Sequence, residues 1–362
     1  MYPYFRLLGQ YADRDRFDLR FASLAPSPSL QRDVDGLGLP AFSLDSPRRA
    51  DYPAAAVRLA RQLRREHMHV VHTHSLDASL VGLLAARASR SVVGVATAHY
   101  SHEIPLYDRW TLSKVDALSL GRFAHHVIAP SDDLRDTLIR FHGVAPSKVT
   151  AIDNGIELEY YEQAASDGSE VRDELGLGER LVMTSIGRVY WIKNQESLIR
   201  AFATVAPEQP EAVLVLAGDG DQKALRELAA SLALEDRMRI LPPRDDTRAL
   251  LAATDLFVHP ALGESFGVVI IEAMATGRPV MSTPVGIARE AVEDGVTGVL
   301  AAGHEPRDLA QAMRRALSVR DDWEAMGRAA RRRVSRFSAS RMVARYERLY
   351  EELVQRAGGR QP

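Results

Sequence analysis

Two glutamates in one short stretch, Glu264 and Glu272, are the residues whose setting points most directly to chemistry. The stretch reads as a strand that ends at His259, a glycine-bearing loop, and a helix that starts near Ser265, a residue type that caps helices well. The unpaired N–H groups at a helix start, together with the helix dipole, favour an anion there. A glycine lets a phosphate approach the backbone closely. The sequence therefore predicts an anion site at Ser265, Phe266 and Gly267.

Glu272 is unusual because it interrupts Val268–Ala275, which reads as a helix with apolar residues on nearly every face. Such a helix is expected to be buried, and a buried carboxylate needs a compensating partner. A ribose has two vicinal hydroxyls, each able to donate a charge-assisted hydrogen bond worth about 1.5–3 kcal/mol. A salt bridge with Arg278 at the helix end is the structural alternative, and the sequence leaves both open.

A second pair of charged residues follows another expected strand. Leu181–Gly187 reads as a strand, and Arg188 and Lys193 stand between it and the next helical stretch. A guanidinium can bind a pyrophosphate bidentately and an ammonium adds a point charge, so the pair suits a nucleotide diphosphate. Taken alone, the same two residues also fit ordinary surface charge.

The elements that must position these residues alternate between short apolar runs and helical stretches. Most of the runs are apolar throughout, as in strands buried on both faces of a parallel sheet. The expected strands are Phe17–Leu24, His69–Thr73, Val92–Ala98, His125–Ala129, Lys148–Ile152, Leu181–Ile186, Ala212–Ala217, Met238–Leu241, Leu256–His259 and Pro279–Ser282. Helical stretches such as Tyr52–Glu66, Ser131–His142, Gln195–Val205 and Lys223–Leu234 fall between them. This order predicts an α/β fold with doubly wound parallel sheets.

The length of 362 residues predicts two domains of ordinary size. Glu159–Gly178 is polar and lacks a strong apolar period, so the boundary is expected there. The last stretch, Ser338–Val354, is helical and carries an apolar stripe that needs a surface to cover it. We therefore expect domains at residues 1–165 and 166–337, and a C-terminal helix within 338–362 that packs back across the domains.

The two glutamates match the E-x7-E signature of glycosyltransferase family 4, and Gly187–Lys193 resembles the family's G-R-x4-K pattern. The resemblance extends from about Phe17 to the last helix. It implies the GT-B fold, in which two Rossmann-like domains face a cleft. The expected helix Tyr4–Tyr11 begins almost at the first residue, so the first domain is expected to lack its first strand.

The resemblance also implies the activity, which is retaining transfer of a hexose from a nucleotide diphosphate sugar, either UDP- or GDP-linked. It places Glu264 beside the sugar hydroxyls, Glu272 on the ribose, and His99, at a strand end of the first domain, near the transferred sugar. A purely structural role for this histidine is the alternative. The residues expected to act in catalysis are His99, Glu264, Arg188 and Lys193. The residues expected to bind the donor are Arg188, Lys193, Glu264, Ser265, Phe266, Gly267, Glu272 and Leu241.

Two other groups of residues resemble metal ligands. Asp219 and Asp221 form a D-x-D sequence after a strand, but in this position they look like the G-D-G loop of the GT-B fold, which needs no metal. The other group is a run of histidines that leads into an expected buried strand, with no carboxylate at matching spacing, namely His67, His69, His72 and His74. We expect no metal and no further cofactor, because arginine and lysine supply the positive charge. His74 is expected to line the acceptor side.

The composition limits the partners and the compartment. A formal net charge of −2 gives no global basic field for nucleic acid, and the absence of cysteine excludes disulfides and thiolate metal sites. No apolar run approaches bilayer length, and Met1–Phe17 lacks the apolar core of a signal peptide. The expectation is a cytoplasmic enzyme that acts on a saccharide or lipid-linked acceptor in cell-surface polysaccharide or glycolipid synthesis. Arg331–Arg333 and the arginines of the final helix alternate with Glu324, Glu347 and Glu351, as on a solvated face, and peripheral contact with the inner membrane face stays an open alternative.

Two other functions remain compatible with the sequence. A sugar-nucleotide epimerase on the same fold would turn over nucleotide sugar without an acceptor. A catalytically silent nucleotide-sugar-binding protein would bind the donor and transfer nothing, which would agree with a first domain that lacks a strand.

Overall fold

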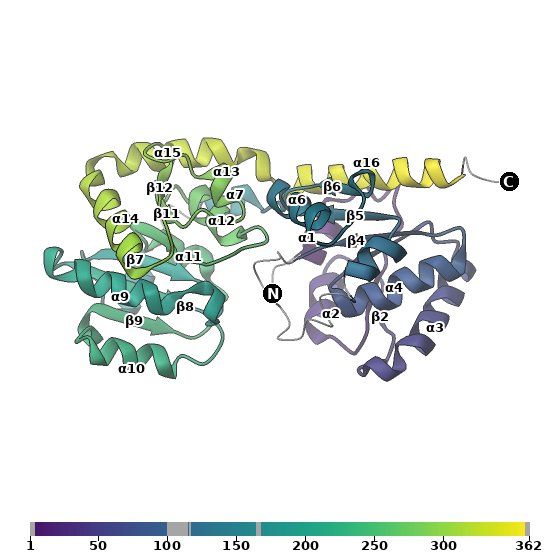
Figure 1. The fold of residues 1–362 in the computed structure, drawn as a ribbon, viewed down its shortest axis with the longest axis horizontal. Helices are drawn as coiled ribbons and strands as arrows, with labels where there is room; N and C mark the ends of the chain where they lie inside the picture. The colour runs from purple at the N-terminus through teal and green to yellow at the C-terminus, as the bar shows by residue number, and fades with distance from the viewer. Residues whose placement is uncertain (1–3, 100–114, 116, 164–167, 359–362) are drawn as a thin grey trace. The chain divides into compact units, whose positions relative to one another are not determined.

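The computed structural model describes residues 4–99, 115, 117–163 and 168–358 of the 362-residue chain. Contacts divide the chain into two compact units, residues 1–155 with 339–362, and residues 156–338 (Figure 1). The chain therefore enters the second unit after Gly155 and leaves it at Ser338. The last helix, α16 (Ala339–Gly358), belongs to the first unit.

The second unit contains a six-stranded parallel sheet with the order β12-β11-β10-β7-β8-β9. The order runs outward from β7 to β9 and then returns to the other side of β7 with β10, which is the doubly wound arrangement. The topological switch point therefore lies between β7 and β10. The strand bounds are Leu181–Ile186 for β7, Ala212–Ala217 for β8, Met238–Leu241 for β9, Leu256–His259 for β10, Val280–Ser282 for β11 and Gly298–Leu300 for β12.

Alternate residues of the central strands face opposite sides of this sheet. Leu214 and Leu216 of β8 join one apolar cluster with Phe202, whereas Val213 and Val215 join a cluster on the other face. The first cluster is covered by α9 (Gln195–Val205), α10 (Lys223–Ser231) and α14 (Pro306–Ser318), the second by α8 (Ser169–Glu174) and α11 (Thr247–Ala252). Because both faces are covered, the strands appear in the sequence as continuous apolar runs.

The other helices of this unit gather around α12 (Val268–Ala275), the helix that carries Glu272. It packs against α15 (Trp323–Val334) and α7 (Leu158–Glu162), and α15 also contacts α13 (Ala288–Ala291). The helix is buried mainly through Ile270, Ile271, Ala273, Met274 and Ala275.

The first unit contains a four-stranded parallel sheet, β3-β4-β5-β6, and a separate two-stranded parallel sheet, β1-β2. The strand bounds are Phe21–Ser23 for β1, Ala41–Ser43 for β2, Val70–His74 for β3, Val93–Thr97 for β4, His126–Ala129 for β5 and Val149–Ala151 for β6. The helices between them are α2 (Pro28–Asp35), α3 (Tyr52–Arg65), α4 (Leu76–Ser89) and α6 (Asp132–Arg140). Every strand expected from the sequence is present, whereas β2 and β12 were not expected.

The two sheets of the first unit are interrupted where the sequence analysis expected a strand to be missing. Among the described residues, no strand precedes α1 (Tyr4–Tyr11), and β3 pairs with β4 on one side only. Most residues of β3 are half-buried, whereas every residue of β4 is buried. The fold is thus GT-B-like α/β, with the first sheet in two parts.

Helix α16 covers the first unit with the apolar stripe expected from its sequence. Met342, Val343, Tyr346 and Leu349 are buried in one cluster with Leu7 of α1. Both α1 and β4 contact α16, so the stripe finds its cover within the first unit. Among the described residues, none of the helices is long and apolar enough to cross a membrane.

Candidate functional site

The predicted donor residues of the second unit follow the two strands that flank the switch point. Arg188 and Lys193 come after β7, and Glu264 comes after β10. In an open α/β sheet, ligands bind outside the carboxyl ends of the strands at this point. The sheet order therefore brings two stretches of chain to the place where a nucleotide is expected.

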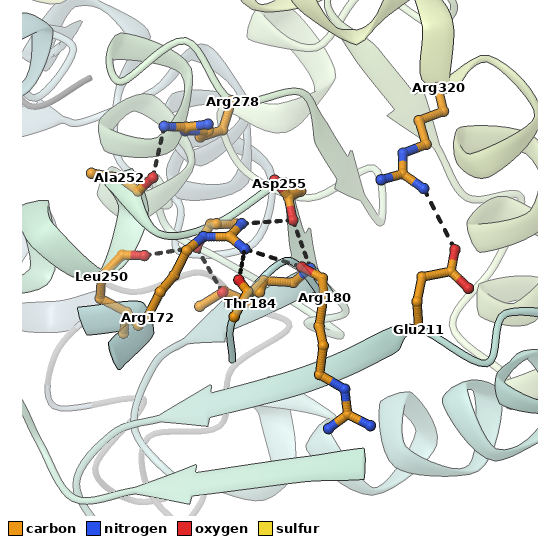
Figure 2. Close-up of polar contacts among 12 residues, drawn as sticks. Arg172, Arg180, Thr184, Glu211, Leu250, Ala252, Asp255, Arg278 and Arg320 are labelled. Carbon is orange, nitrogen blue, oxygen red and sulfur yellow. Dashed lines mark hydrogen bonds and ion pairs between the residues drawn. The ribbon is translucent and has the colours of Figure 1, made fainter. Parts of the chain in front are cut away.

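The base of these two strands is fixed by a polar network (Figure 2). Asp255, which precedes β10, accepts hydrogen bonds from the Val182 N–H of β7 at 2.7 Å and from Arg172 at 2.9 Å. The Thr254 hydroxyl donates to Thr184 at 2.7 Å. These bonds hold β7 and β10 in register, so the loops at their other ends start from fixed positions.

Lys193, Glu264 and His259 form one cluster at the carboxyl ends. The Lys193 ammonium and the Nε2 atom of His259 both contact Oε1 of Glu264, the latter at 3.0 Å. Burial alone would raise the pKa of the Glu264 carboxyl, but the close contact with His259 and the charge of Lys193 lower it to about 2. Glu264 is therefore a stable anion that can accept hydrogen bonds from sugar hydroxyls.

The loop after Glu264 reaches α12 by a different route from the one predicted. The helix begins at Val268, and its cap is Gly267 with φ of +92°, so Ser265 is not the N-cap and that prediction was wrong. Only glycine adopts this backbone conformation without strain. Phe266 is buried against Phe337, with ring centroids 6.0 Å apart, and this contact anchors the loop. The helix cap therefore lies two residues after Ser265, at Gly267.

Glu272 lies half-buried on α12, which packs against α7, the helix that carries Tyr161. Burial raises the pKa of Glu272 from its ordinary value to about 7, although the nearby Tyr161 hydroxyl works in the other direction. The salt bridge considered as an alternative does not form, because Nη2 of Arg278 donates to the Ala252 carbonyl at 2.7 Å (Figure 2). The pKa of Glu272 is thus strongly perturbed, as is common for carboxylates in binding sites.

This raised pKa predicts a stability that depends on pH. The folded chain holds the Glu272 proton to higher pH than the unfolded chain, so the contribution is present below pH 4.5 and is lost as the pH rises through 7. Glu272→Gln stays neutral, so it should lose less stability than the wild type between pH 5 and 8. The loss in free energy of unfolding over this pH range should be larger for the wild type than for Glu272→Gln by up to about 3 kcal/mol. Urea unfolding at several pH values measures it, and Glu293→Gln, at an exposed ion pair with Arg333, is the control.

Two predicted donor residues have less distinctive surroundings. Arg188 is exposed, and within the described ranges no carboxylate lies at ion-pair distance from its guanidinium. Leu241 ends β9, and its carbonyl accepts hydrogen bonds from Nε2 of Gln222 at 2.5 Å and from the Gly218 N–H at 3.3 Å. The roles assigned to Arg188 and Leu241 remain predictions.

His99 lies in the first unit, among histidines that the sequence analysis considered as metal ligands. Its Nε2 atom is 2.9 Å from Nδ1 of His74, and the His74 ring lies 4.3 Å from that of His72. Burial lowers the pKa of His99 to about 4 and that of His72 to about 3, so both rings are neutral at pH 7. Across the described residues, no three histidine, cysteine or carboxylate side chains are grouped as metal ligands. The role of His99 near the sugar stays a prediction.

Sequence reasoning missed two residues of the site, His259 and Tyr161. The signal for His259 was its place as the last residue of β10, directly before the glutamate loop. Tyr161 gave no signal, because α7 and α12 lie far apart in the chain.

Comparison with known proteins identifies the family. The model described as Glycosyltransferase Family 4 matches residues 4–160, and the one described as Glycosyl transferases group 1 matches residues 168–333. A D-inositol 3-phosphate glycosyltransferase of Salinispora arenicola is 32% identical over 332 residues, which cover 84% of this chain and 73% of that protein. The chain belongs to glycosyltransferase family 4. It is therefore an enzyme of a retaining glycosyltransferase family, as the E-x7-E pattern implied.

Solved structures of related proteins confirm the fold of this family 4 glycosyltransferase. Anabaena Alr3699/HepE, crystallised in complex with UDP-glucose, is 25% identical with a TM-score of 0.85, covering 97% of this chain and 95% of that one. Sucrose-phosphate synthase from Thermosynechococcus elongatus is 21% identical with a TM-score of 0.79, and the match covers 97% of this chain and 93% of the synthase chain. The second likeness concerns the fold alone.

Proposed function

We propose that this glycosyltransferase takes its sugar from a UDP-sugar, with UDP-glucose as the first donor to test. The observation that carries the proposal is the grouping of Lys193, Glu264 and the start of α12 at the switch point of the sheet. A cation, an ionised carboxylate and unpaired N–H groups match the phosphates and the sugar hydroxyls of such a donor. The related HepE was crystallised with UDP and with UDP-glucose, which favours uridine over guanosine.

In the proposed reaction, the bond between the anomeric carbon and the β-phosphate oxygen breaks, and the acceptor oxygen bonds to the same face of that carbon. The acceptor proton passes to the leaving phosphate. Arg188, Lys193 and the first N–H groups of α12 stabilise the negative charge that develops on the diphosphate. Glu264 orients the sugar and Glu272 the ribose, and no side chain is assigned as a covalent nucleophile.

The acceptor we propose is a saccharide or a lipid-linked saccharide, and the reaction takes place in the cytoplasm. The names of the Salinispora and Rhodococcus relatives add inositol phosphate as an acceptor to test. Arg333 and Arg336 form ion pairs with Glu293 and Glu290, so part of the basic surface is already neutralised. This favours weak contact at the inner membrane face over firm attachment.

The proposal predicts that UDP binds more tightly than GDP or ADP in a calorimetric titration. Lys193→Ala and Glu272→Ala should each weaken UDP binding by about tenfold or more, because each removes a charged partner worth about 1.5–3 kcal/mol. Lys223→Ala, at an exposed helix position, is the matched control and should bind UDP as the wild type does. Tighter binding of GDP would overturn the choice of base, and no binding by a folded protein would overturn the proposal.

A second measurement separates transfer from the rival activities. The interrupted sheet of the first unit favours testing whether the bound donor is turned over at all. Release of UDP from UDP-glucose that depends on acceptor supports transfer. Conversion of the sugar without acceptor would support an epimerase, and binding without turnover would support a silent binding protein.

A further inference from the structure

Three loops of the second unit meet at the side chain of Asn194, the residue directly after Lys193. Its Nδ2 atom donates to the carbonyl oxygen of Pro260 at 3.1 Å and to that of His304 at 2.9 Å. Pro260 follows β10 in the loop that leads to Glu264, and His304 lies between β12 and α14. One amide group therefore joins the loop that carries Lys193 to the loops after β10 and β12.

The orientation of this amide follows from the chemistry of its partners. Backbone carbonyls accept hydrogen bonds and cannot donate them, so the side-chain nitrogen of Asn194 must face Pro260 and His304, and both of its N–H groups are used. A carbonyl partner also fixes the His304 ring, whose Nδ1 atom lies 3.1 Å from the carbonyl oxygen of Ala261 and must therefore donate its proton. The loop after β12 is thus bonded both to Asn194 and to the residue that follows Pro260.

The backbone at Asn194 is in the left-handed conformation, with φ of +54° and ψ of +32°, which asparagine adopts more readily than most residues. This conformation ends the single 3-10 turn Trp191–Lys193 and starts α9. The next residue, Gln195, is buried, and its Nε2 atom donates to the carbonyl oxygen of Arg188 at 2.9 Å. Two consecutive amides therefore hold the loop from Arg188 to Lys193, Gln195 within the loop and Asn194 against its neighbours.

A backbone bond adds to this connection on the other side of Lys193. The Leu262 N–H, two residues before Glu264, donates at 2.8 Å to the carbonyl oxygen of Ile192, which directly precedes Lys193. The side chains of Lys193 and Glu264 are in contact. The chain on both sides of Lys193 is therefore bonded to the loop that carries Glu264, by Ile192 before it and by Asn194 after it.

We propose that Asn194 is a further positioning residue of the donor site, whose amide sets the place of the Lys193 ammonium against Glu264 and the leaving diphosphate. This inference rests on the proposed function, because it takes Lys193 as a partner of the diphosphate. A preorganised charge stabilises the transition state only where it is held in place, and a misplacement of about 1 Å can lower the rate about 100-fold. Loss of the amide should therefore lower kcat more than it raises KM.

The test replaces Asn194 with glycine, which adopts a φ of +54° without strain, so the backbone is kept and only the amide is lost. Asn194→Gly should lower kcat for UDP release from UDP-glucose by about tenfold and change KM by no more than about twofold. Ala233→Gly is the matched control, because Ala233 has a φ of +53° in an exposed turn of the same unit. The control should keep the wild-type kcat.

A double-mutant cycle with Lys193→Met separates positioning from a general structural role. When the lysine is already methionine, no ammonium remains to be placed, so Asn194→Gly should then lower kcat by no more than about twofold. The same tenfold loss in both backgrounds would overturn the inference, because the effect would not pass through Lys193. A wild-type kcat for Asn194→Gly alone would overturn it as well.

Hydrogen exchange, measured without nucleotide, tests the connection between the loops separately from the reaction. The Leu262 N–H should exchange about tenfold faster or more in Asn194→Gly, because the loop it is bonded to has lost its amide. The Val182 N–H, bonded to Asp255 at 2.7 Å at the base of the strands, should exchange as in the wild type. Unchanged exchange of Leu262 would overturn the inference. Absence of UDP-glucose turnover by the wild type would instead overturn the proposed function, and with it any role of Asn194 at a diphosphate.

Discussion

Replacing Lys193 with methionine should lower kcat/KM for UDP release from UDP-glucose by about 10²–10³-fold, the range seen when one preorganised charge-stabilising group is removed. The ammonium contacts Glu264 at the carboxyl ends of β7 and β10, where the diphosphate is proposed to leave. Methionine keeps the length of the side chain but removes its charge. The loss should appear mainly in kcat, because the charge on the leaving group develops in the transition state.

The Lys193 variant should also disturb its neighbour. The charge of Lys193 helps to hold the pKa of Glu264 at about 2, so the pKa of this buried carboxyl should rise when the charge is lost. Lys223→Met, which alters an exposed lysine of α10, is the matched control and should leave the rate unchanged. Retention of more than a third of wild-type kcat/KM by Lys193→Met would contradict a role for this lysine at the diphosphate.

Gly218→Ala should lower the free energy of unfolding by about 3 kcal/mol or more, the upper part of the range for overpacking a close-packed interior. A Cβ atom at this position would lie 1.9 Å from the carbonyl oxygen of Gly187, so the ends of β7 and β8 would have to separate. These ends are held by the Gly187 N–H bond to Ala217 at 2.9 Å and the Val189 N–H bond to Asp219 at 2.6 Å. The loop with Arg188 and Lys193 starts here, so its displacement should also weaken UDP binding. A loss of about 3 kcal/mol of binding free energy corresponds to about 100-fold weaker binding.

Urea unfolding and calorimetry measure the two effects of Gly218→Ala. The control is Gly36→Ala in the first unit, where a Cβ meets nothing within 4 Å and the backbone φ is −62°. That variant should match the wild type in both measurements. Normal UDP affinity in a stable Gly218→Ala protein would show that the approach of the two strand ends does not position the phosphate loop.

The strands of the second unit were predictable because each strand is marked by its own continuous run of apolar residues. β7, β8, β9 and β10 have the bounds expected from the sequence, since a strand covered on both faces must be apolar throughout. β2 and β12 were missed because each has three residues, Ala41–Ser43 and Gly298–Leu300, and carries no comparable apolar run. Such short edge strands are defined by their pairing partners and not by their own composition.

The helix start after Glu264 shows where a local preference fails. Serine is a good cap in general, yet the chain continues past Ser265 in a loop and turns into α12 at Gly267. The Phe266 carbonyl accepts a hydrogen bond from the Ile287 N–H at 2.7 Å, and its ring is buried against Phe337. These contacts come from residues that are distant in the sequence, so the local sequence does not predict their stabilising effect.

The sequence by itself determined the family and the doubly wound architecture, and it predicted the types of residue expected at the donor site. Parallel strands, glycine turns and paired charges each leave a pattern within a few neighbouring positions. Only the tertiary structure decided which of those residues meet. Lys193 contacts Glu264 across 71 residues, and Arg278 donates to the carbonyl of Ala252 instead of pairing with the nearby Glu272. The reason is physical: the ionisation of a buried carboxylate depends on which donors the folded chain brings within hydrogen-bond reach, and that is set by the packing of α12 against α7 and by the order of β7 and β10 in the sheet.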